Sequence, residues 1–119
     1  MTIARIRDTM QFAESFEAIK VSARGITEHV IIRVYSTKRQ GVYGYQFAAI
    51  CWPNKGDGIA SDKTGGCGYD KINACTAAVL QRAFPVEKIE GQSVYAYCEG
   101  WGPTRTLSDL GYTVIHAHG

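Results

Sequence analysis

The sequence lacks any long apolar run. None of its 119 residues belongs to a stretch that approaches the roughly 20 apolar residues of a membrane-spanning helix. The opening residues, MTIARIRDTMQF, hold two arginines among the apolar side chains, which is not the pattern of a secretory signal peptide. We therefore expect a soluble protein that has no membrane partner and stays in the cytoplasm where it is made.

Closely spaced metal ligands are missing as well. Cys51, Cys67, Cys75 and Cys98 contain no Cys-x-x-Cys pair, and structural zinc sites use such pairs because a short turn aims both ligands at one ion. We expect no metal and no cofactor. A domain of this size does not depend on disulfides, so free thiols in a reducing compartment are favoured. Two disulfides, with three possible connectivities, are the alternative.

Motifs for catalysis on nucleotides or phosphate are also absent. No Gly-x4-Gly-Lys-Ser/Thr loop can be written, and Gly66-x-Gly68 is followed by Lys71, where a dinucleotide-binding pattern needs a third glycine. Cys98 and Arg105 have six residues between them, one too many for a phosphatase loop. No carboxylate pair has the spacing of a general acid and base. We therefore expect no enzymatic activity.

Cys67 carries the one enzymatic alternative. It lies in a glycine-rich loop just before an expected helix, where free N–H groups and the helix dipole lower the pKa of a thiol. No histidine lies near it in the sequence. A small cysteine-dependent enzyme is the reading that this residue would support.

The composition is that of one ordinary globular domain. Hydrophobic residues make up 45% of the chain and charged residues 20%, which argues against extended disorder. The length fits a single domain over residues 1–119.

Hydrophobic periodicity predicts an α+β fold. Alternating apolar residues indicate strands over residues 16–23, 29–35, 43–52, 93–98 and 112–116. Helical spacing indicates a short helix through Ile3, Ile6, Met10 and Ala13, a main helix over residues 70–84 and a short helix over residues 104–110. We therefore expect a small antiparallel sheet of about four to five strands with one main helix packed on one face.

The expected elements have individual signals. Val30, Ile32 and Val34 alternate onto one face of a strand, while Ile19 and Val21 share a face of another. In the main helix, Asp70 is a good N-cap and Pro85 stops the helix. The apolar stripe of this helix consists of Ile72, Cys75, Val79 and Ala83, widened by Leu80. Residues 53–69 are expected to form one long loop, and such loops are usually functional or mobile.

Positive charge is concentrated in the middle of the chain. Residues 29–82 hold seven basic and three acidic residues, a net charge of +4, while the flanks hold six basic and eight acidic residues, a net charge of −2. This asymmetry favours an anionic or acidic partner. The candidate contact residues are the basic and aromatic residues Lys38, Arg39, Tyr43, Tyr45, Trp52, Lys55, Lys63 and Lys71.

The glycine-rich helix entry resembles the end of a double-stranded RNA-binding domain. The residues that fit this pattern are Gly66, Gly68, Lys71, Ala74, Ala77 and Ala78. The resemblance implies phosphate contacts through Lys71. However, Ile72 and Cys75 stand where that family usually has further lysines, which removes most of a phosphate clamp.

Residues 64–78 also resemble a GG-x-GYDK helix-entry element of small phage and mobile-element proteins. The motif is Gly65-Gly66-Cys67-Gly68-Tyr69-Asp70-Lys71. This resemblance implies a counter-defence factor, such as an anti-CRISPR inhibitor, that occupies a host protein or nucleoprotein complex in the host cytoplasm. The sequence therefore favours a non-enzymatic binding protein, with direct nucleic-acid binding as the alternative.

Overall fold

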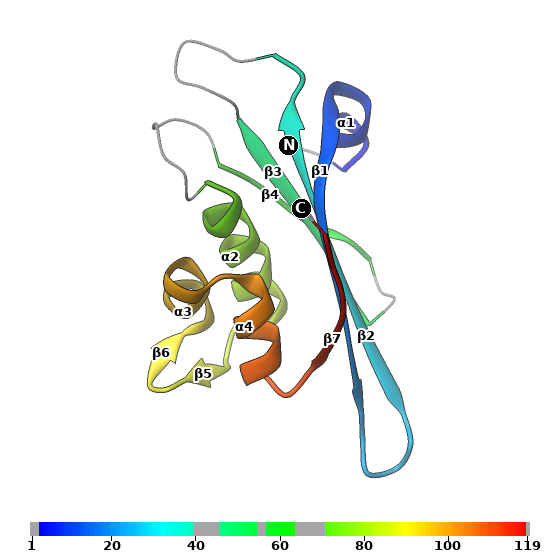
Figure 1. Ribbon diagram of the computed structural model, residues 1–119, viewed down its shortest axis with the longest axis vertical. Helices are drawn as coiled ribbons and strands as arrows, with labels where there is room; N and C mark the ends of the chain where they lie inside the picture. Colours follow the sequence, from blue (N-terminus) through cyan, green and yellow to red (C-terminus); the bar gives the residue numbers. More distant parts are fainter. Residues whose placement is uncertain (1–2, 40–45, 55–56, 64–70, 119) are drawn as a thin grey trace.

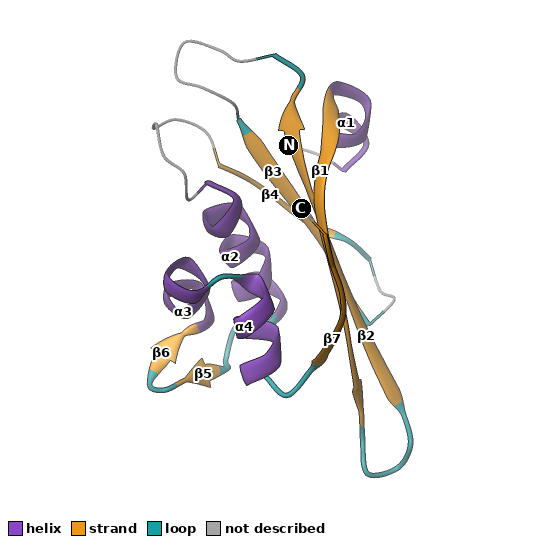
Figure 2. Cartoon of the chain, in the orientation of Figure 1, coloured by secondary structure: helices purple, strands orange, loops and turns teal. Residues whose placement is uncertain are grey.

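A computed structural model describes residues 3–39, 46–54, 57–63 and 71–118. Over these residues the chain has an α+β fold, with four helices and a five-stranded antiparallel sheet in the order β4-β3-β2-β1-β7 (Figures 1 and 2). A two-stranded ribbon, β5 and β6, is separate from this sheet. The elements are α1 (Ile3–Thr9), β1 (Met10–Val21), β2 (Thr27–Thr37), β3 (Phe47–Pro53), β4 (Ile59–Lys63), α2 (Lys71–Ala83), β5 (Lys88–Ile89), β6 (Gln92–Ser93), α3 (Val94–Trp101), α4 (Pro103–Asp109) and β7 (Thr113–His118).

The first four strands follow one another as antiparallel neighbours. Val30, Ile32 and Val34 of β2 are fully buried on the helix side, which confirms the predicted face. In β1 the core side is taken by Phe16 and Ala18, whereas Val21 is 60% exposed. Ile19 and Val21 do share a face of β1, but it is the face opposite to the main core. The β1–β2 pairing is regular from Phe16 to Val21, so Phe16 and Ala18 alternate with Ile19 and Val21 onto opposite faces.

Three helices cover one face of the sheet (Figure 1). The longest, α2, lies on β3 and β4, while α4 lies against β7 and α3 packs on α2. Cys75, Val79 and Leu80 of the predicted apolar stripe are fully buried, and α2 ends before Pro85 as expected. The predicted main helix thus exists, and it shares its layer with α3 and α4.

The opposite face of the sheet has a second, smaller core. Ile6 of α1 is fully buried against Ile50 of β3 and Tyr35 of β2. In β3, Ala49 and Cys51 face the helix layer instead. Both faces of β3 are therefore buried, which accounts for its nearly continuous apolar sequence.

Three predicted elements differ from the structure. The N-terminal helix ends at Thr9, because Met10 already begins β1. The long loop over residues 53–69 contains β4, which pairs with β3 from Phe47 to Cys51. The strand predicted over residues 93–98 is wrong, because Ser93 caps a helix through its side chain, which accepts a hydrogen bond from the Ala96 N–H. A serine at this position satisfies a free N–H group of the first helical turn.

The last predicted elements are confirmed with small shifts. The short helix expected over residues 104–110 is α4, and the final strand is β7. The turn between β2 and β3 closes through Thr37, whose N–H donates to the Gln46 carbonyl at 2.9 Å. Within the described ranges, no helix has the length and hydrophobicity that a bilayer crossing requires.

Candidate functional site

A tight corner joins α3 to α4. Gly102 has φ +86°, in the left-handed region that favours glycine. Its N–H donates to the Cys98 carbonyl at 2.8 Å, which ends α3, and its carbonyl accepts from the Thr106 hydroxyl at 2.7 Å, which secures the start of α4. Pro103 occupies the first turn of α4, a position where its missing N–H has no cost. The corner thus holds the two helices in a fixed relation.

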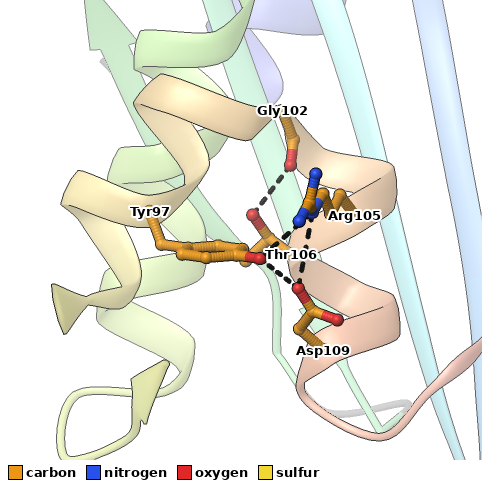
Figure 3. A network of polar contacts seen from close by, with 5 residues as sticks. All are labelled: Tyr97, Gly102, Arg105, Thr106 and Asp109. Carbon is orange, nitrogen blue, oxygen red and sulfur yellow. Dashed lines mark hydrogen bonds and ion pairs between the residues drawn. The ribbon is translucent and has the colours of Figure 1, made fainter. Parts of the chain in front are cut away.

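Tyr97, Arg105 and Asp109 meet across this corner (Figure 3), and Trp101 lies against the arginine. The Tyr97 hydroxyl donates to Asp109 Oδ2, and Arg105 Nε donates to the Tyr97 oxygen at 3.2 Å. Arg105 Nε also lies 3.7 Å from Asp109 Oδ2 as an ion pair. On the other side, the Arg105 guanidinium lies over the Trp101 ring, 4.0 Å from its centroid. A cation in this position is attracted to the ring electrons.

The depth of these side chains differs. Tyr97 is fully buried, whereas Trp101 is 55% exposed and the Arg105 side chain is about half exposed. The Tyr97 and Trp101 rings are 6.4 Å apart between centroids. The buried tyrosine therefore anchors two residues that are presented to solvent.

The hydrogen bonds also shift the pKa of Tyr97 and of Arg105. The bond to Asp109 is the main reason that the pKa of Tyr97 is raised, so its phenol stays protonated and acts as a donor. The bond to Tyr97 raises the pKa of Arg105. Because the contacts to Tyr97 and Asp109 use Nε, the four N–H groups on the terminal nitrogens of Arg105 are not used in them. The arrangement can bind an acceptor group while holding the arginine in place.

Other exposed residues of α3 and α4 lie close to Trp101 in the sequence. Gly100 is exposed, and a Cβ added there would meet no heavy atom within 4 Å. Ala96 and Thr104 are exposed as well. We call the surface formed by Trp101, Arg105 and Asp109 the corner patch. It presents one aromatic ring and an arginine–aspartate ion pair.

Sequence reasoning missed this patch. Tyr97, Trp101, Arg105 and Asp109 recur every four residues, a spacing that places side chains on one helical face. The Gly102–Pro103 break hid the pattern, because it indicates that a helix ends there. The available signal was the spacing of four within each helix, from Tyr97 to Trp101 and from Arg105 to Asp109.

Several predicted contact residues lie at one end of the sheet. Lys38 and Arg39 are exposed just after β2. Lys63 ends β4 opposite Phe47, which in turn lies opposite Ser36 of β2. Lys71 begins α2 close to the same end (Figure 1). The structure brings the backbones of these four basic residues to one end of the molecule; the side chains of Lys63 and Lys71 are outside the description.

Trp52 lies elsewhere. It pairs with Ile31, toward the other end of β3, and it packs half-buried beside α1, where the Arg7 guanidinium carbon is 5.8 Å from its ring centroid. Its ring therefore belongs to the second core and not to the basic end. The predicted contacts Tyr43, Tyr45 and Lys55 lie outside the described residues.

The described cysteines are buried free thiols. Burial raises the pKa of Cys51 and of Cys75 to about 12, and it also raises the pKa of Cys98. These thiols are protonated at neutral pH, so they are not activated nucleophiles. Cys67 and the expected N-cap Asp70 lie outside the described residues. Among the residues that are described, no cluster of histidine, cysteine and carboxylate side chains could hold a metal ion.

In comparisons with known proteins, no family, no curated protein and no solved structure matches this chain. The corner patch is therefore interpreted from its geometry.

Proposed function

We propose that this chain is a non-enzymatic binding protein whose contact surface centres on the corner patch. Its partner is a host protein or nucleoprotein complex, which the chain occupies in the manner of a phage-type counter-defence inhibitor. The single observation that carries the choice of surface is the stacking of Arg105 on Trp101, with Tyr97 and Asp109 holding the arginine from behind.

Pre-organisation supports this choice. Ordering a long side chain on binding costs roughly 0.5–1.5 kcal/mol, and Arg105 is already held at Nε and over a ring. Tryptophan, tyrosine and arginine are also the residues that most often dominate the energy of an interface. Trp101 is itself 55% exposed, so a partner can reach its ring. A partner that offers a carboxylate or a carbonyl oxygen next to an apolar surface fits this patch.

The test compares Trp101→Ala and Arg105→Ala with the wild type in affinity capture from a bacterial host lysate, with and without nuclease. The matched control is Val86→Ala, because Val86 is an apolar side chain that is 83% exposed elsewhere on the surface. We expect a nuclease-resistant protein partner that the control retains and both patch variants lose. Each patch variant should weaken binding by about 2 kcal/mol, or roughly thirtyfold.

Two results would contradict the proposal. A partner that all variants retain equally would place the contact surface elsewhere. Capture that disappears on nuclease treatment would favour direct nucleic-acid binding.

Direct nucleic-acid binding is the second candidate, and one observation favours it. The backbones of Lys38, Arg39, Lys63 and Lys71 lie at the same end of the molecule, and clustered basic residues are the electrostatic footprint of phosphate binding. Fluorescence anisotropy with double-stranded RNA tests this directly. The salt dependence is the slope of the logarithm of the binding constant against the logarithm of the salt concentration. Joint replacement of Lys38 and Arg39 by alanine should reduce this slope by about one unit for each lost phosphate contact. Lys88→Ala should leave it unchanged. Weak binding with no such difference would count against this candidate.

A further inference from the structure

The two edge strands of the sheet are treated differently. β4 and β7 stand at opposite ends of the strand order. On β4, the Arg82 side chain of α2 donates to the Ala60 carbonyl oxygen at 2.6 Å, and the strand also contains Asp62 and Lys63. Charged residues and covering side chains are the usual means by which proteins block further strand pairing at an edge. The β4 edge is therefore protected.

β7 lacks the charged side chains that protect β4, although the extra residue Ile115 gives it a bulge. Its residues, TVIHAH, include no aspartate, glutamate, lysine, arginine or proline. Thr113, Ile115 and Ala117 are exposed, with Ile115 at 52%. One side of β7 pairs with β1, and its place at the end of the strand order leaves the other side without a neighbouring strand in the described part of the chain. Such an edge is a template for pairing with another strand.

We propose that β7 pairs with β7 of a second copy of this chain, which joins two five-stranded sheets into one continuous sheet. A two-fold axis makes an antiparallel strand pair self-complementary. If one residue of the first copy contacts a second residue of the other copy, the reverse contact forms as well. This inference concerns self-association, and it goes beyond the proposed binding function.

The side-chain faces of β7 fit this pairing. Val114 and Ala117 lie opposite Ala18 and Phe16 of β1, which are core residues of the helix side. Ile115 is the extra residue of the register shift between these pairs, so Val114 and Ala117 share a face although three positions separate them. A two-fold axis at the centre of β7 then places Val114 of each copy opposite Ala117 of the other copy. The helix-covered faces of the two sheets thus lie on the same side of the continuous sheet.

Charge favours a second copy over a charged peptide as the occupant. A strand without formally charged residues can lie beside its own copy without like-charge repulsion. The strand is short, so the buried area is at the low end for specific interfaces. We therefore expect a weak, reversible dimer.

Sedimentation equilibrium over a wide range of protein concentration tests the dimer. The wild type should pass from monomer to dimer, and Ile115→Lys should weaken dimerisation at least about tenfold, because an edge lysine opposes strand pairing. The matched control is Ile26→Lys, since Ile26 is 59% exposed in the turn between β1 and β2. It should dimerise like the wild type. Circular dichroism verifies that both variants fold.

Hydrogen exchange of the wild type provides a second measurement that needs no variant. Amides of β7 should become more protected as the protein concentration rises, and amides of β4 should not. A wild type that stays monomeric throughout would overturn the proposal. So would equal dimerisation of Ile115→Lys and the wild type, an equal loss in Ile26→Lys, or concentration-dependent protection at β4 instead of β7.

Discussion

The ring of Phe84 packs edge-on against the ring of Tyr112, with their centroids 5.8 Å apart. This contact joins the end of α2 to the start of β7. A pocket of about 200 Å³ opens beside it, lined by Lys20, Glu28, Phe84, Glu87, Leu110 and Tyr112. Burial, followed by the charge of Glu28, raises the pKa of Tyr112 from 10 to about 12.

This pKa predicts a loss of stability at alkaline pH. The unfolded chain loses its phenol proton near pH 10 while the folded protein keeps it until about pH 12. The higher pKa of Tyr112 in the folded protein therefore contributes fully to the free energy of unfolding below pH 10. This contribution disappears as the pH rises toward 12. Urea unfolding should show a smaller alkaline decrease in the free energy of unfolding for Tyr112→Phe than for the wild type. Identical pH profiles would contradict the assignment to Tyr112.

Gly102 and Gly100 form a matched pair for substitution by alanine. Gly102 has φ +86°, whereas Gly100 has no positive φ and open space around it. An alanine at Gly102 meets only the Asn73 side chain at ordinary contact distance, so its cost is backbone strain, about 1–2 kcal/mol. Gly100→Ala should be neutral or stabilise the helix by up to about 1 kcal/mol. Thermal unfolding of both variants measures the difference, and a Gly102→Ala variant as stable as the wild type would contradict it.

Tyr97→Phe should loosen Arg105 without removing the packed ring. The change removes the hydroxyl that donates to Asp109 and accepts from Arg105, and we expect a destabilisation of about 1 kcal/mol. Tyr95→Phe is the control, because Tyr95 is a half-buried tyrosine of the same helix. Chemical denaturation checks the stability, and partner capture should weaken for Tyr97→Phe alone. An equal effect of the two changes would show that the hydroxyl network does not position the arginine.

The buried thiols should resist alkylation. The pKa of Cys51 and of Cys75 is raised from 9 to about 12, so their thiolate forms are scarce at neutral pH, and their side chains are buried. Iodoacetamide followed by mass spectrometry should modify Cys51, Cys75 and Cys98 only after unfolding. Fast modification of Cys67 in the native protein would support the thiol-enzyme alternative. If Cys67 reacts no faster than an unstructured thiol, that alternative should be abandoned.

Arg82→Ala should expose the β4 edge. The substitution removes a charged hydrogen bond to the Ala60 carbonyl at 2.6 Å. Because Arg82 is exposed, we expect a loss of only about 1 kcal/mol, but faster hydrogen exchange along β4. Arg82→Lys should restore part of this protection, since a lysine is also a donor. Unchanged exchange at β4 in Arg82→Ala would show that the contact does not protect the edge.

The local pattern predicted the sheet and its main helix where one period holds over several residues. Val30, Ile32 and Val34 alternate, and their burial follows the period of two along a strand. Cys75, Val79 and Leu80 likewise follow the helical period onto one buried face. In both segments the residues that face the core between the sheet and the helices carry the pattern.

Prediction failed where capping decided the outcome. Residues 93–98 contain valine and tyrosines, which favour strands. The Ser93 cap and the burial of Val94, Tyr97 and Cys98 on one face favour a helix instead. The same helix carries Tyr97 and Trp101 to the corner patch, so the error over this segment also hid the candidate site.

The sequence by itself determined which segments alternate and where α2 runs, because neighbouring residues set these features. Only the tertiary structure decided that β7 lies beside β1, that α1 closes the far face over Ile50, and that Arg105 stacks on Trp101. Each of these contacts depends on the complete sheet or on the turn angle at Gly102. A local hydrophobic period contains no information about which distant surface it meets.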